Sequence, residues 1–181
     1  MESKENIIME IFFNNPTREW HFEELLRDCK MARSKLSLWL RKFTKEKIIK
    51  KIKIKSKMPH YISNHESIEY KNRKRLFGIE RLYGCGLIDH LAGLKASTII
   101  IFGSFSRSDW YKESDIDIFV YGDIEGLKTA AYETKLGREI QIFHCAGKKD
   151  VEKYGSALMK NIVKGDIIKG DIEFVKVEIN A

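Results

Sequence analysis

The sequence predicts an α+β protein built from two parts, and three observations support this fold class. Apolar residues recur at helical spacing through much of residues 5–46. Isoleucines then alternate with lysines up to residue 55, which is the period of a half-buried strand. Further on, the apolar β-branched run of residues 99–102 and a second apolar run at residues 116–120 indicate buried strands of a sheet.

The charge of the chain is divided unevenly between these two parts. Residues 1–75 contain 19 Lys and Arg against 10 Asp and Glu, whereas residues 76–181 contain 14 against 16. A basic surface is the usual footprint of contact with phosphates. The two parts are therefore expected to be separate modules with different partners.

Other features of the sequence exclude several classes of protein. No apolar run reaches the roughly 18 residues that a membrane span needs. The N-terminus carries acidic residues and has no secretory signal pattern, so we expect a cytoplasmic protein without membrane contact. The three cysteines and five histidines are scattered without metal-ligand spacing, which indicates reduced thiols and no structural zinc site.

The first part is expected to contain three helices and a β-hairpin. The predicted helices cover residues 5–13, residues 22–30 and residues 33–46, and the third has Leu36, Leu40 and Phe43 on one face. A basic strand at residues 48–55, a turn and a returning strand at residues 60–62 follow. Only about four residues separate the second and third helices, as in a helix-turn-helix. The order resembles the winged helix-turn-helix modules of prokaryotic regulators, and we assign residues 1–65 to such a domain.

This resemblance implies that the third helix enters the major groove of double-stranded DNA and that the lysines of the wing contact phosphates. The expected DNA-binding residues are Arg33, Ser34, Lys35, Ser37, Arg41, Lys42, Lys53, Lys55 and Lys57. Two alternatives stay open, namely a merely solvated basic surface and a module that docks a protein. A homodimer is also compatible with the resemblance.

A linker helix over residues 66–84 is expected to join the two domains. Ile68, Leu76, Ile79 and Leu82 recur among charged residues and would pack against both domains. The glycines at residues 84 and 86 should end this helix. Its basic run at residues 71–75 is expected to be solvated.

The residues that can carry chemistry stand between residues 99 and 143. Gly103 and Ser104 follow directly on the first apolar strand, and Asp115 and Asp117 stand on the second. Glycine lets the backbone approach a ligand closely, and the amide groups of the turn attract phosphate. Two aspartates at positions i and i+2 of a strand point the same way and can hold a hard cation. The pattern therefore predicts a site for a magnesium-bound nucleoside triphosphate.

The stretch IIIFGSFSRSDWYKESDIDIFV resembles the nucleotidyltransferase superfamily of DNA polymerase β, particularly its minimal prokaryotic members. The resemblance covers residues 86–181 and implies a small α/β nucleotidyltransferase domain with a mixed sheet, assigned here to residues 85–181. It implies that Asp115 and Asp117 bind Mg²⁺ or Mn²⁺. The nucleotide would be bound by Gly103, Ser104, Arg107 and Ser114, the last two matching an arginine and a serine that are common in the family.

One position departs from the family pattern. The family places a third carboxylate on the next strand after a Leu-Gly-Arg stretch, and the residue aligned with it here is Gln141. An amide cannot take a proton from an attacking hydroxyl. Glu139, two residues earlier on the same strand face, is the candidate replacement and the third candidate catalytic residue.

Two functions for the whole chain stay open. The first is an enzyme that transfers a nucleoside monophosphate from a triphosphate to a hydroxyl of a protein, a small molecule or a nucleic-acid end. The second is a transcriptional regulator that senses a nucleotide through a catalytically degenerate domain and binds DNA. Gln141 favours the regulator, and the intact Gly-Ser and Asp-Ile-Asp patterns favour the enzyme.

The remaining C-terminal elements are expected to be scaffold. Helices are predicted over residues 125–135 and 150–164, the second with Gly165 at its end, and a terminal strand is predicted over residues 167–178.

Overall fold

The computed structural model of the chain describes residues 3–55 and 57–174. It divides into two compact units. The N-terminal unit runs up to Phe77 and also includes Ser108–Glu113, and the C-terminal unit consists of Gly78–Arg107 and of the chain from Ser114 onward. The first division falls inside one helix, α4 (Ile68–Cys85).

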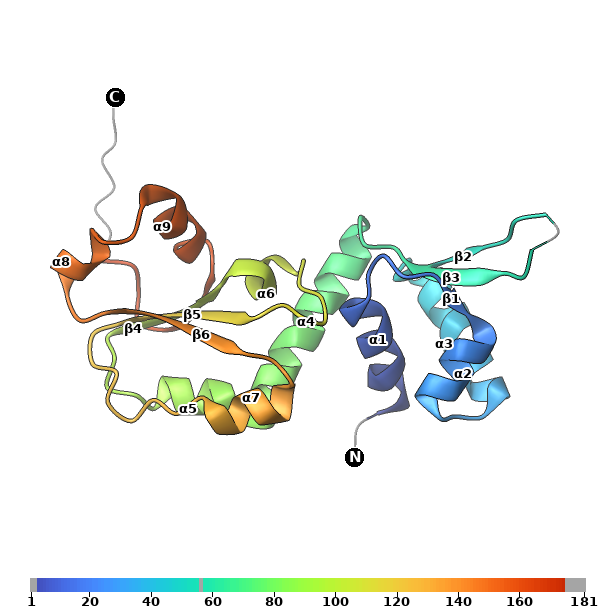
Figure 1. Cartoon of the computed structure of the whole chain (residues 1–181), viewed down its shortest axis with the longest axis horizontal. Coiled ribbons are helices and arrows are strands. Elements are labelled where there is room, and N and C mark those ends of the chain that lie inside the picture. The colour runs from blue at the N-terminus through green and yellow to red at the C-terminus, as the bar shows by residue number, and fades with distance from the viewer. Residues whose placement is uncertain (1–2, 56, 175–181) are drawn as a thin grey trace, which may run out of the picture. The chain divides into compact units, whose positions relative to one another are not determined.

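The N-terminal unit contains three complete helices, the first part of α4 and a three-stranded antiparallel sheet (Figure 1). The elements follow one another as α1 (Lys4–Asn14), β1 (Trp20–His21), α2 (Phe22–Cys29), α3 (Arg33–Lys45), β2 (Ile49–Ile52) and β3 (His60–Ser63). The three predicted helices and the returning strand are confirmed to within about a residue. The basic strand is shorter than expected because it ends at Ile52, so Lys53 and Lys55 lie in the loop before β3.

The helices of this unit bury the faces that their apolar spacing indicates. Leu36, Leu40 and Phe43 of α3 are at most 1% exposed, and Phe12 and Leu25 of the two preceding helices are fully buried. Burial of each such side chain stabilises the fold by roughly 1.5–3 kcal/mol. The core of the unit therefore fixes which side of α3 faces the solvent.

A segment from later in the sequence completes this core. Trp110 is 2% exposed, stacks on Phe77 at 6.4 Å between ring centroids and meets the ring of Phe13 edge-on at 6.1 Å. The buried ammonium of Lys74 donates hydrogen bonds to the carbonyls of Phe13, at 3.0 Å, and of Trp110. It also lies 4.3 Å from the centroid of the Trp110 ring. One cation thus joins three segments of the chain.

The buried face of α4 is the expected one only in part, since Leu82 is 2% exposed but two of the other expected residues are not buried. Ile68 and Leu76 are 63% and 54% exposed, whereas Tyr70, Lys74 and Phe77 are at most 3% exposed. These three residues have the spacing i, i+4, i+7 of a helix face. The expectation was wrong because it placed Lys74 within a solvated basic run, although its ammonium pairs with buried carbonyls. The helix also continues through Gly84 and ends only at Gly86, which has a φ of +86°.

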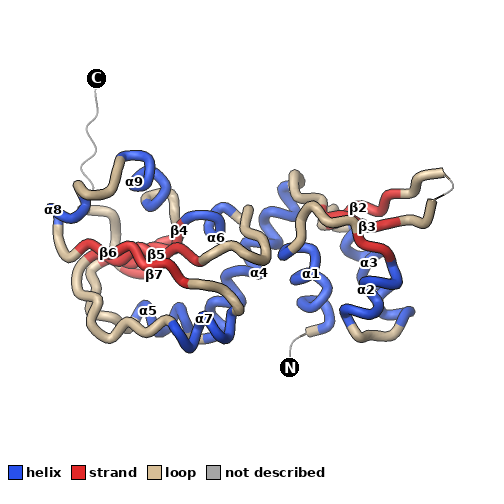
Figure 2. The backbone as a smooth tube through the Cα atoms, viewed as in Figure 1, coloured by secondary structure: helices blue, strands red, loops and turns tan. Residues whose placement is uncertain are grey.

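The C-terminal unit is built on a mixed four-stranded sheet in the order β6-β5-β4-β7. Its strands are β4 (Thr98–Phe102), β5 (Ile116–Tyr121), β6 (Ile140–Cys145) and β7 (Asp166–Lys169). The pair β5–β6 is parallel and the other two pairs are antiparallel, so the expected mixed sheet is confirmed. Helices α5 (Leu87–Ala92) and α7 (Ala130–Leu136) lie on one face, and α6 (Gly103–Arg107) and α9 (Ser156–Ile162) lie on the other (Figures 1 and 2).

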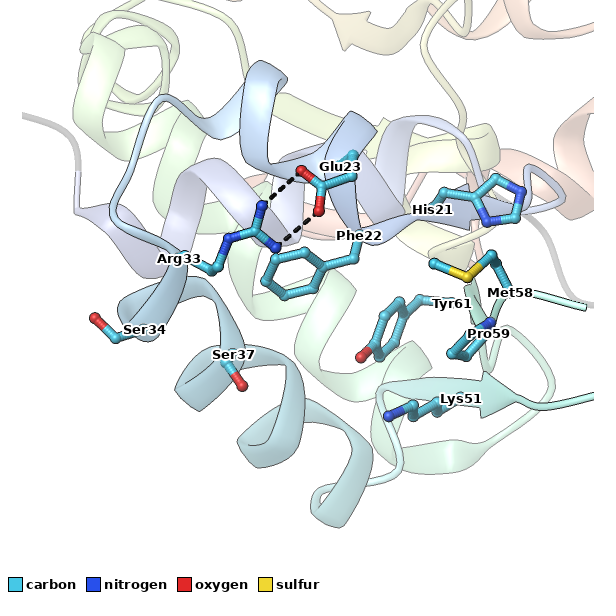
Figure 3. A pocket seen from close by; sticks show the side chains of 10 residues that line it. All are labelled: His21, Phe22, Glu23, Arg33, Ser34, Ser37, Lys51, Met58, Pro59 and Tyr61. Atoms are coloured by element: carbon cyan, nitrogen blue, oxygen red, sulfur yellow. Dashed lines mark hydrogen bonds and ion pairs between the residues drawn. The ribbon is translucent and has the colours of Figure 1, made fainter.

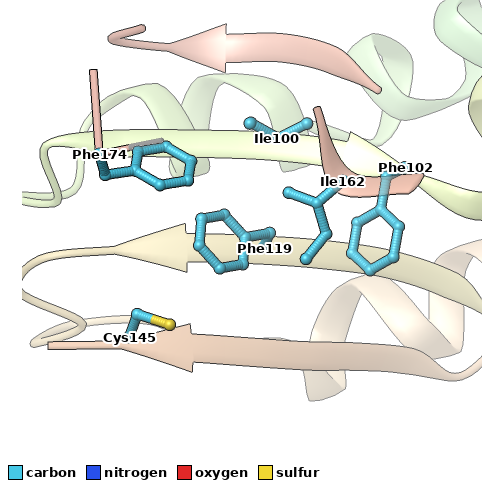
Figure 4. Close-up of a cluster of buried hydrophobic side chains, with 6 residues drawn as sticks. All are labelled: Ile100, Phe102, Phe119, Cys145, Ile162 and Phe174. Carbon is cyan, nitrogen blue, oxygen red and sulfur yellow. The ribbon is translucent and has the colours of Figure 1, made fainter. Parts of the chain in front are cut away.

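A cluster of buried side chains fills the face of the sheet that α9 covers (Figure 4). Its members are Ile100, Phe102, Phe119, Cys145, Ile162 and Phe174. Phe119 and Phe174 lie 5.2 Å apart between ring centroids. Since side chains alternate along a strand, Asp117 lies on the same face as Phe119 and marks the polar end of this cluster.

The last third of the chain differs from its prediction in several places. The helix expected over residues 125–135 begins only at Ala130. The single helix expected over residues 150–164 is instead two short helices, α8 (Lys148–Val151) and α9. Gly165 does not end a helix, because α9 already ends at Ile162. Its role is a close approach to β4, since a Cβ at residue 165 would lie 2.5 Å from the carbonyl oxygen of Ile101. Of the terminal strand expected over residues 167–178, residues 167–169 lie in β7 and residues 170–174 form bends and a turn instead. Residues 175–178 lie outside the described residues.

Among the described helices, none combines the length and the apolar content needed to cross a bilayer.

Candidate functional site

The two motif segments meet at one end of the sheet in the C-terminal unit. Because β4 and β5 are antiparallel, Phe102 at the end of β4 pairs with Asp117 near the start of β5. Gly103 and Ser104 follow directly as the first residues of α6. The structure therefore brings the predicted Gly-Ser turn beside the predicted carboxylates.

Gly103 stands where a larger residue would be strained and would displace a carboxylate. Its φ is +72°, and a Cβ at this position would lie 2.0 Å from Oδ2 of Asp117. The first value belongs to a backbone conformation that L-residues rarely adopt, and the second is far shorter than any non-bonded contact. The close approach of a carboxylate to the backbone thus explains the glycine.

The two carboxylates interact electrostatically. Burial of the half-buried Asp117 raises the pKa of its carboxyl group, the negative charge of Asp115 raises this pKa further, and Arg107 opposes both effects. A carboxylate that is disfavoured by burial and by a like charge is stabilised by a bound cation. Carboxylate oxygens are also the ligands that Mg²⁺ and Mn²⁺ prefer. The residues present therefore fit a hard divalent cation.

Gln141 occupies the position at which a third carboxylate would complete this pair. The strands β5 and β6 are parallel, and their register places Asp117 beside Gln141. Glu139 lies just before β6, where its side chain is exposed and its carbonyl accepts a hydrogen bond of 2.9 Å from the N–H of Ile116. Two residues of a strand span about 6.6 Å. To replace a carboxylate at the position of Gln141, the side chain of Glu139 must extend along β6 over that distance.

Arg138 holds the loop before Asp115 and was not singled out from the sequence as a site residue. Its Nη1 donates a hydrogen bond of 2.8 Å to the carbonyl of Ser114. Its guanidinium carbon lies 5.4 Å from the centroid of the Phe105 ring. The signal for this role was present in the Leu-Gly-Arg stretch, whose glycine ends α7 with a φ of +64°. Of the other predicted nucleotide-binding residues, Arg107 is exposed at the end of α6 and Ser114 is half-buried.

A comparison with protein families assigns this region. The model of the polymerase beta nucleotidyltransferase family matches residues 88–173. The match covers all four strands of the sheet together with Gly103, Asp115 and Asp117, and it supports the superfamily for this part of the chain. Comparisons with curated proteins and with solved structures gave no match.

Nucleotidyltransferases of this superfamily generally use divalent metal ions. Within the described residues, no group of three or more His, Cys, Asp or Glu side chains is placed to hold a metal. The assignment of Asp115 and Asp117 as metal ligands of the C-terminal unit therefore stays a prediction.

The predicted DNA-binding residues lie on two elements of the N-terminal unit. Lys53, Lys55 and Lys57 are exposed in the loop between β2 and β3, and Ser37 is the one half-buried member of the set on α3. Two of the cations already have partners. Arg33 forms a bidentate ion pair with Glu23, at 2.7 and 2.9 Å, and Lys42 donates to Glu5 at 3.1 Å. A single exposed pair such as Lys42–Glu5 contributes only about 0–1 kcal/mol, whereas a bidentate arginine–carboxylate pair is among the stronger surface ion pairs.

Proposed function

We propose that the C-terminal unit transfers a nucleoside monophosphate from a nucleoside triphosphate to a hydroxyl group, with release of pyrophosphate. The observation that carries this proposal is the contact between Gly103 and Asp117, where a carboxylate approaches a backbone turn so closely that a Cβ is excluded. Backbone amides, a hydroxyl and two carboxylates gathered at one strand end suit a cation-bound triphosphate.

Each residue has a role in this proposal. Asp115 and Asp117 hold the cation, which supplies positive charge against the phosphates and the leaving pyrophosphate. The backbone of Gly103 and the hydroxyl of Ser104 bind phosphate oxygens. The acceptor oxygen bonds to the α-phosphorus while the bond from that phosphorus to the pyrophosphate oxygen breaks. The acceptor proton passes to Glu139 or to water, because Gln141 cannot take it.

A second candidate function is favoured by the register of β6. The amide of Gln141 beside Asp117 leaves the carboxylate pair without a third acid. In this case the unit binds the nucleotide and its cation without turnover. The chain is then a regulator that senses a nucleotide and binds DNA through its N-terminal unit.

We propose nucleic-acid binding by the N-terminal unit under either function. Three helices and a hairpin in the order α1-β1-α2-α3-β2-β3 support a winged helix. The exposed cations of α3 and of the loop after β2 support contact with phosphates. Duplex DNA with α3 in its major groove is the form of binding that the winged-helix resemblance implies.

One experiment separates the two functions. The full chain is incubated with each of four labelled triphosphates and Mg²⁺, with and without a chelator, beside an Asp117→Asn variant. Labelled pyrophosphate and a nucleotidylated product that require both Mg²⁺ and Asp117 are expected for the enzyme. Calorimetric binding that requires Mg²⁺ but yields no product with any acceptor favours the regulator. Tight binding that survives both chelation and an Asp115→Asn, Asp117→Asn double variant contradicts both.

A further inference from the structure

The N-terminal unit has a hollow between α3 and the β2–β3 hairpin. Its volume is about 1020 Å³, at the upper end of the range of roughly 300–1,000 Å³ found for ligand pockets. Figure 3 shows side chains from α2, α3 and both hairpin strands around it. The hollow is thus formed by the elements that would face a nucleic acid.

The walls of this hollow combine flat apolar groups with hydroxyls. Phe22 and Pro59 are half-buried and supply ring surfaces, and Tyr61, 8% exposed, also lines the hollow. The guanidinium carbon of Arg33 lies 5.3 Å from the centroid of the Phe22 ring, and the hydroxyls of Ser34 and Ser37 lie on the α3 side (Figure 3). Unpaired bases are recognised in this manner, by stacking on aromatic side chains and by hydrogen bonds to their edges. Paired bases expose only their edges in the grooves, because their flat faces are covered by neighbouring base pairs.

The charge around the hollow favours an anionic occupant. Glu23 is the one acid among its described lining residues, and the guanidinium of Arg33 neutralises it. Lys51 lines the hollow with its ammonium 5.8 Å from the centroid of the Tyr61 ring, and it forms no ion pair with any described residue. Further lysines are exposed on the same hairpin, at residues 50, 53, 55 and 57. A strand of nucleic acid offers both the bases and the phosphates that this combination fits.

We infer that the hollow takes an unpaired base and that the adjoining lysines contact the phosphates of the same strand. The N-terminal unit therefore prefers a single strand, or a duplex with an overhang, to a fully paired duplex. The inference rests on the proposed binding of nucleic acid and specifies its form. In this arrangement, the hydroxyls of Ser34 and Ser37 form hydrogen bonds with the edge of the unpaired base.

Two consecutive residues of α3 allow a matched test. Ser37 lines the hollow, whereas the neighbouring Leu38 is 64% exposed and is not part of the lining. The variants Ser37→Glu and Leu38→Glu add the same charge, one inside the hollow and one in a separate hollow beside Lys35 and Lys42. A helix lying in a major groove would be weakened by both changes, and a base pocket mainly by the first.

The experiment measures fluorescence anisotropy of the full chain with labelled 12-nucleotide probes at low salt. The probes are a DNA single strand, its RNA counterpart, the DNA duplex, and the DNA strand with abasic sites. We expect the single strands to bind about tenfold more tightly than the duplex or the abasic strand, since stacking contributes roughly 1–3 kcal/mol per base. Ser37→Glu should lower the affinity for the single strand about tenfold, and Leu38→Glu should lower it only about two- to threefold.

Each other outcome has a defined meaning. Tighter binding of the duplex, equal affinity for the abasic strand, or equal losses in the two glutamate variants overturns the base pocket and leaves nucleic-acid binding in place. No affinity for any probe overturns both. The pair Ser37→Trp and Leu38→Trp, which fills the hollow without adding charge, separates steric from electrostatic loss. Circular dichroism confirms that each variant is folded.

Discussion

The two units position their candidate functional groups by different physical means. In the C-terminal unit, strand register fixes them, because Phe102 pairs with Asp117 and Asp117 pairs with Gln141. In the N-terminal unit, the side chains proposed to contact nucleic acid lie on the surface of α3 and on a hairpin loop. Strand pairing does not fix the positions of their charged groups there. Changes of a few atoms should therefore have large effects in the first case, and only sums of charges should matter in the second.

The largest effect is expected at the carboxylate pair. Changing both Asp115 and Asp117 to Asn should lower nucleotidyl transfer by about three orders of magnitude or more, since a catalytic metal supplies several kcal/mol. The measurement is a turnover assay with saturating Mg²⁺. Asp123→Asn, an exposed aspartate beyond the other end of β5, is the matched control and should leave turnover unchanged. Equal activity in the double variant and this control would remove the metal site from the mechanism.

Gln141→Asp is expected to act in the opposite direction. A restored general base beside Asp117 should raise turnover by about 10²–10⁴ while nucleotide affinity changes only a few-fold. Side-by-side assays of wild type, Gln141→Asp and Glu139→Ala test this. Brisk wild-type turnover that Glu139→Ala abolishes would instead identify Glu139 as the third carboxylate.

A single methyl group should disturb the same site. Gly103→Ala places a Cβ against Oδ2 of Asp117 and should lower turnover by about 10²-fold, as displacements near 1 Å do elsewhere. Gly126→Ala is the matched control, because its φ of +87° imposes similar backbone strain while the nearest atom lies 3.9 Å away. If both variants lose the same activity, backbone strain rather than contact with the carboxylate explains the glycine.

A pH effect follows from the raised pKa of Asp117. Its carboxyl group takes up a proton at a higher pH than an ordinary aspartate, so the affinity for Mg²⁺ and nucleotide should begin to fall at a correspondingly higher pH. The stability of the fold should change with pH in the opposite direction to this affinity. The folded state binds this proton more tightly than the unfolded chain, so the ionised group destabilises the fold above its folded pKa and is relieved as pH falls through it.

Asp117→Asn should remove that cost at neutral pH. We expect a small rise in the midpoint of thermal unfolding without metal, of about 2–4 °C for each kcal/mol gained. Calorimetric scans of wild type and variant at pH 7 measure it. A lower midpoint for the variant would show that the carboxylate stabilises the fold instead.

The smallest effect is expected from single charges in the N-terminal unit. Changing Lys53 and Lys55 to Ala should lower affinity several-fold for all nucleic-acid sequences alike, and each lost phosphate contact should reduce the salt slope by about 0.7–0.9. Changing Lys148 and Lys149 of the C-terminal unit to Ala removes the same net charge and is the control. Equal losses would mean that affinity follows total charge and not the hairpin.

The proximity of the Gly-Ser turn to Asp117 could be predicted from the sequence because its determinants are local. The alternation of Asp115–Val120 and its distance from Gly103 are sufficient to place glycine and carboxylates together once two neighbouring strands pair. Gln141 was singled out differently, because the family resemblance places a carboxylate at its position.

Features that depend on contacts far apart in the sequence could not be predicted. The buried side of α4 is set by Phe13 and Trp110, which lie on opposite sides of it in the chain. The hollow beside α3 likewise depends on how far the hairpin stands from the helix, and the pairing of Arg33 with Glu23 depends on the angle between α2 and α3. The hydrophobic periodicity of a sequence gives no information on these long-range contacts, distances and angles.

The return of Ser108–Glu113 to the N-terminal unit limits how this protein can be divided. A gene fragment that stops after Phe77 would encode Lys74 and Phe13 without Trp110. The ammonium of Lys74 and the ring of Phe13 would then lose their contacts with the Trp110 ring. Recombination that exchanges the first unit for that of another protein must therefore also exchange six residues between Arg107 and Ser114. Those six residues interrupt the motif segment itself, so an exchange of the first unit has to cut the chain on both sides of them, between Gly103 and Asp115.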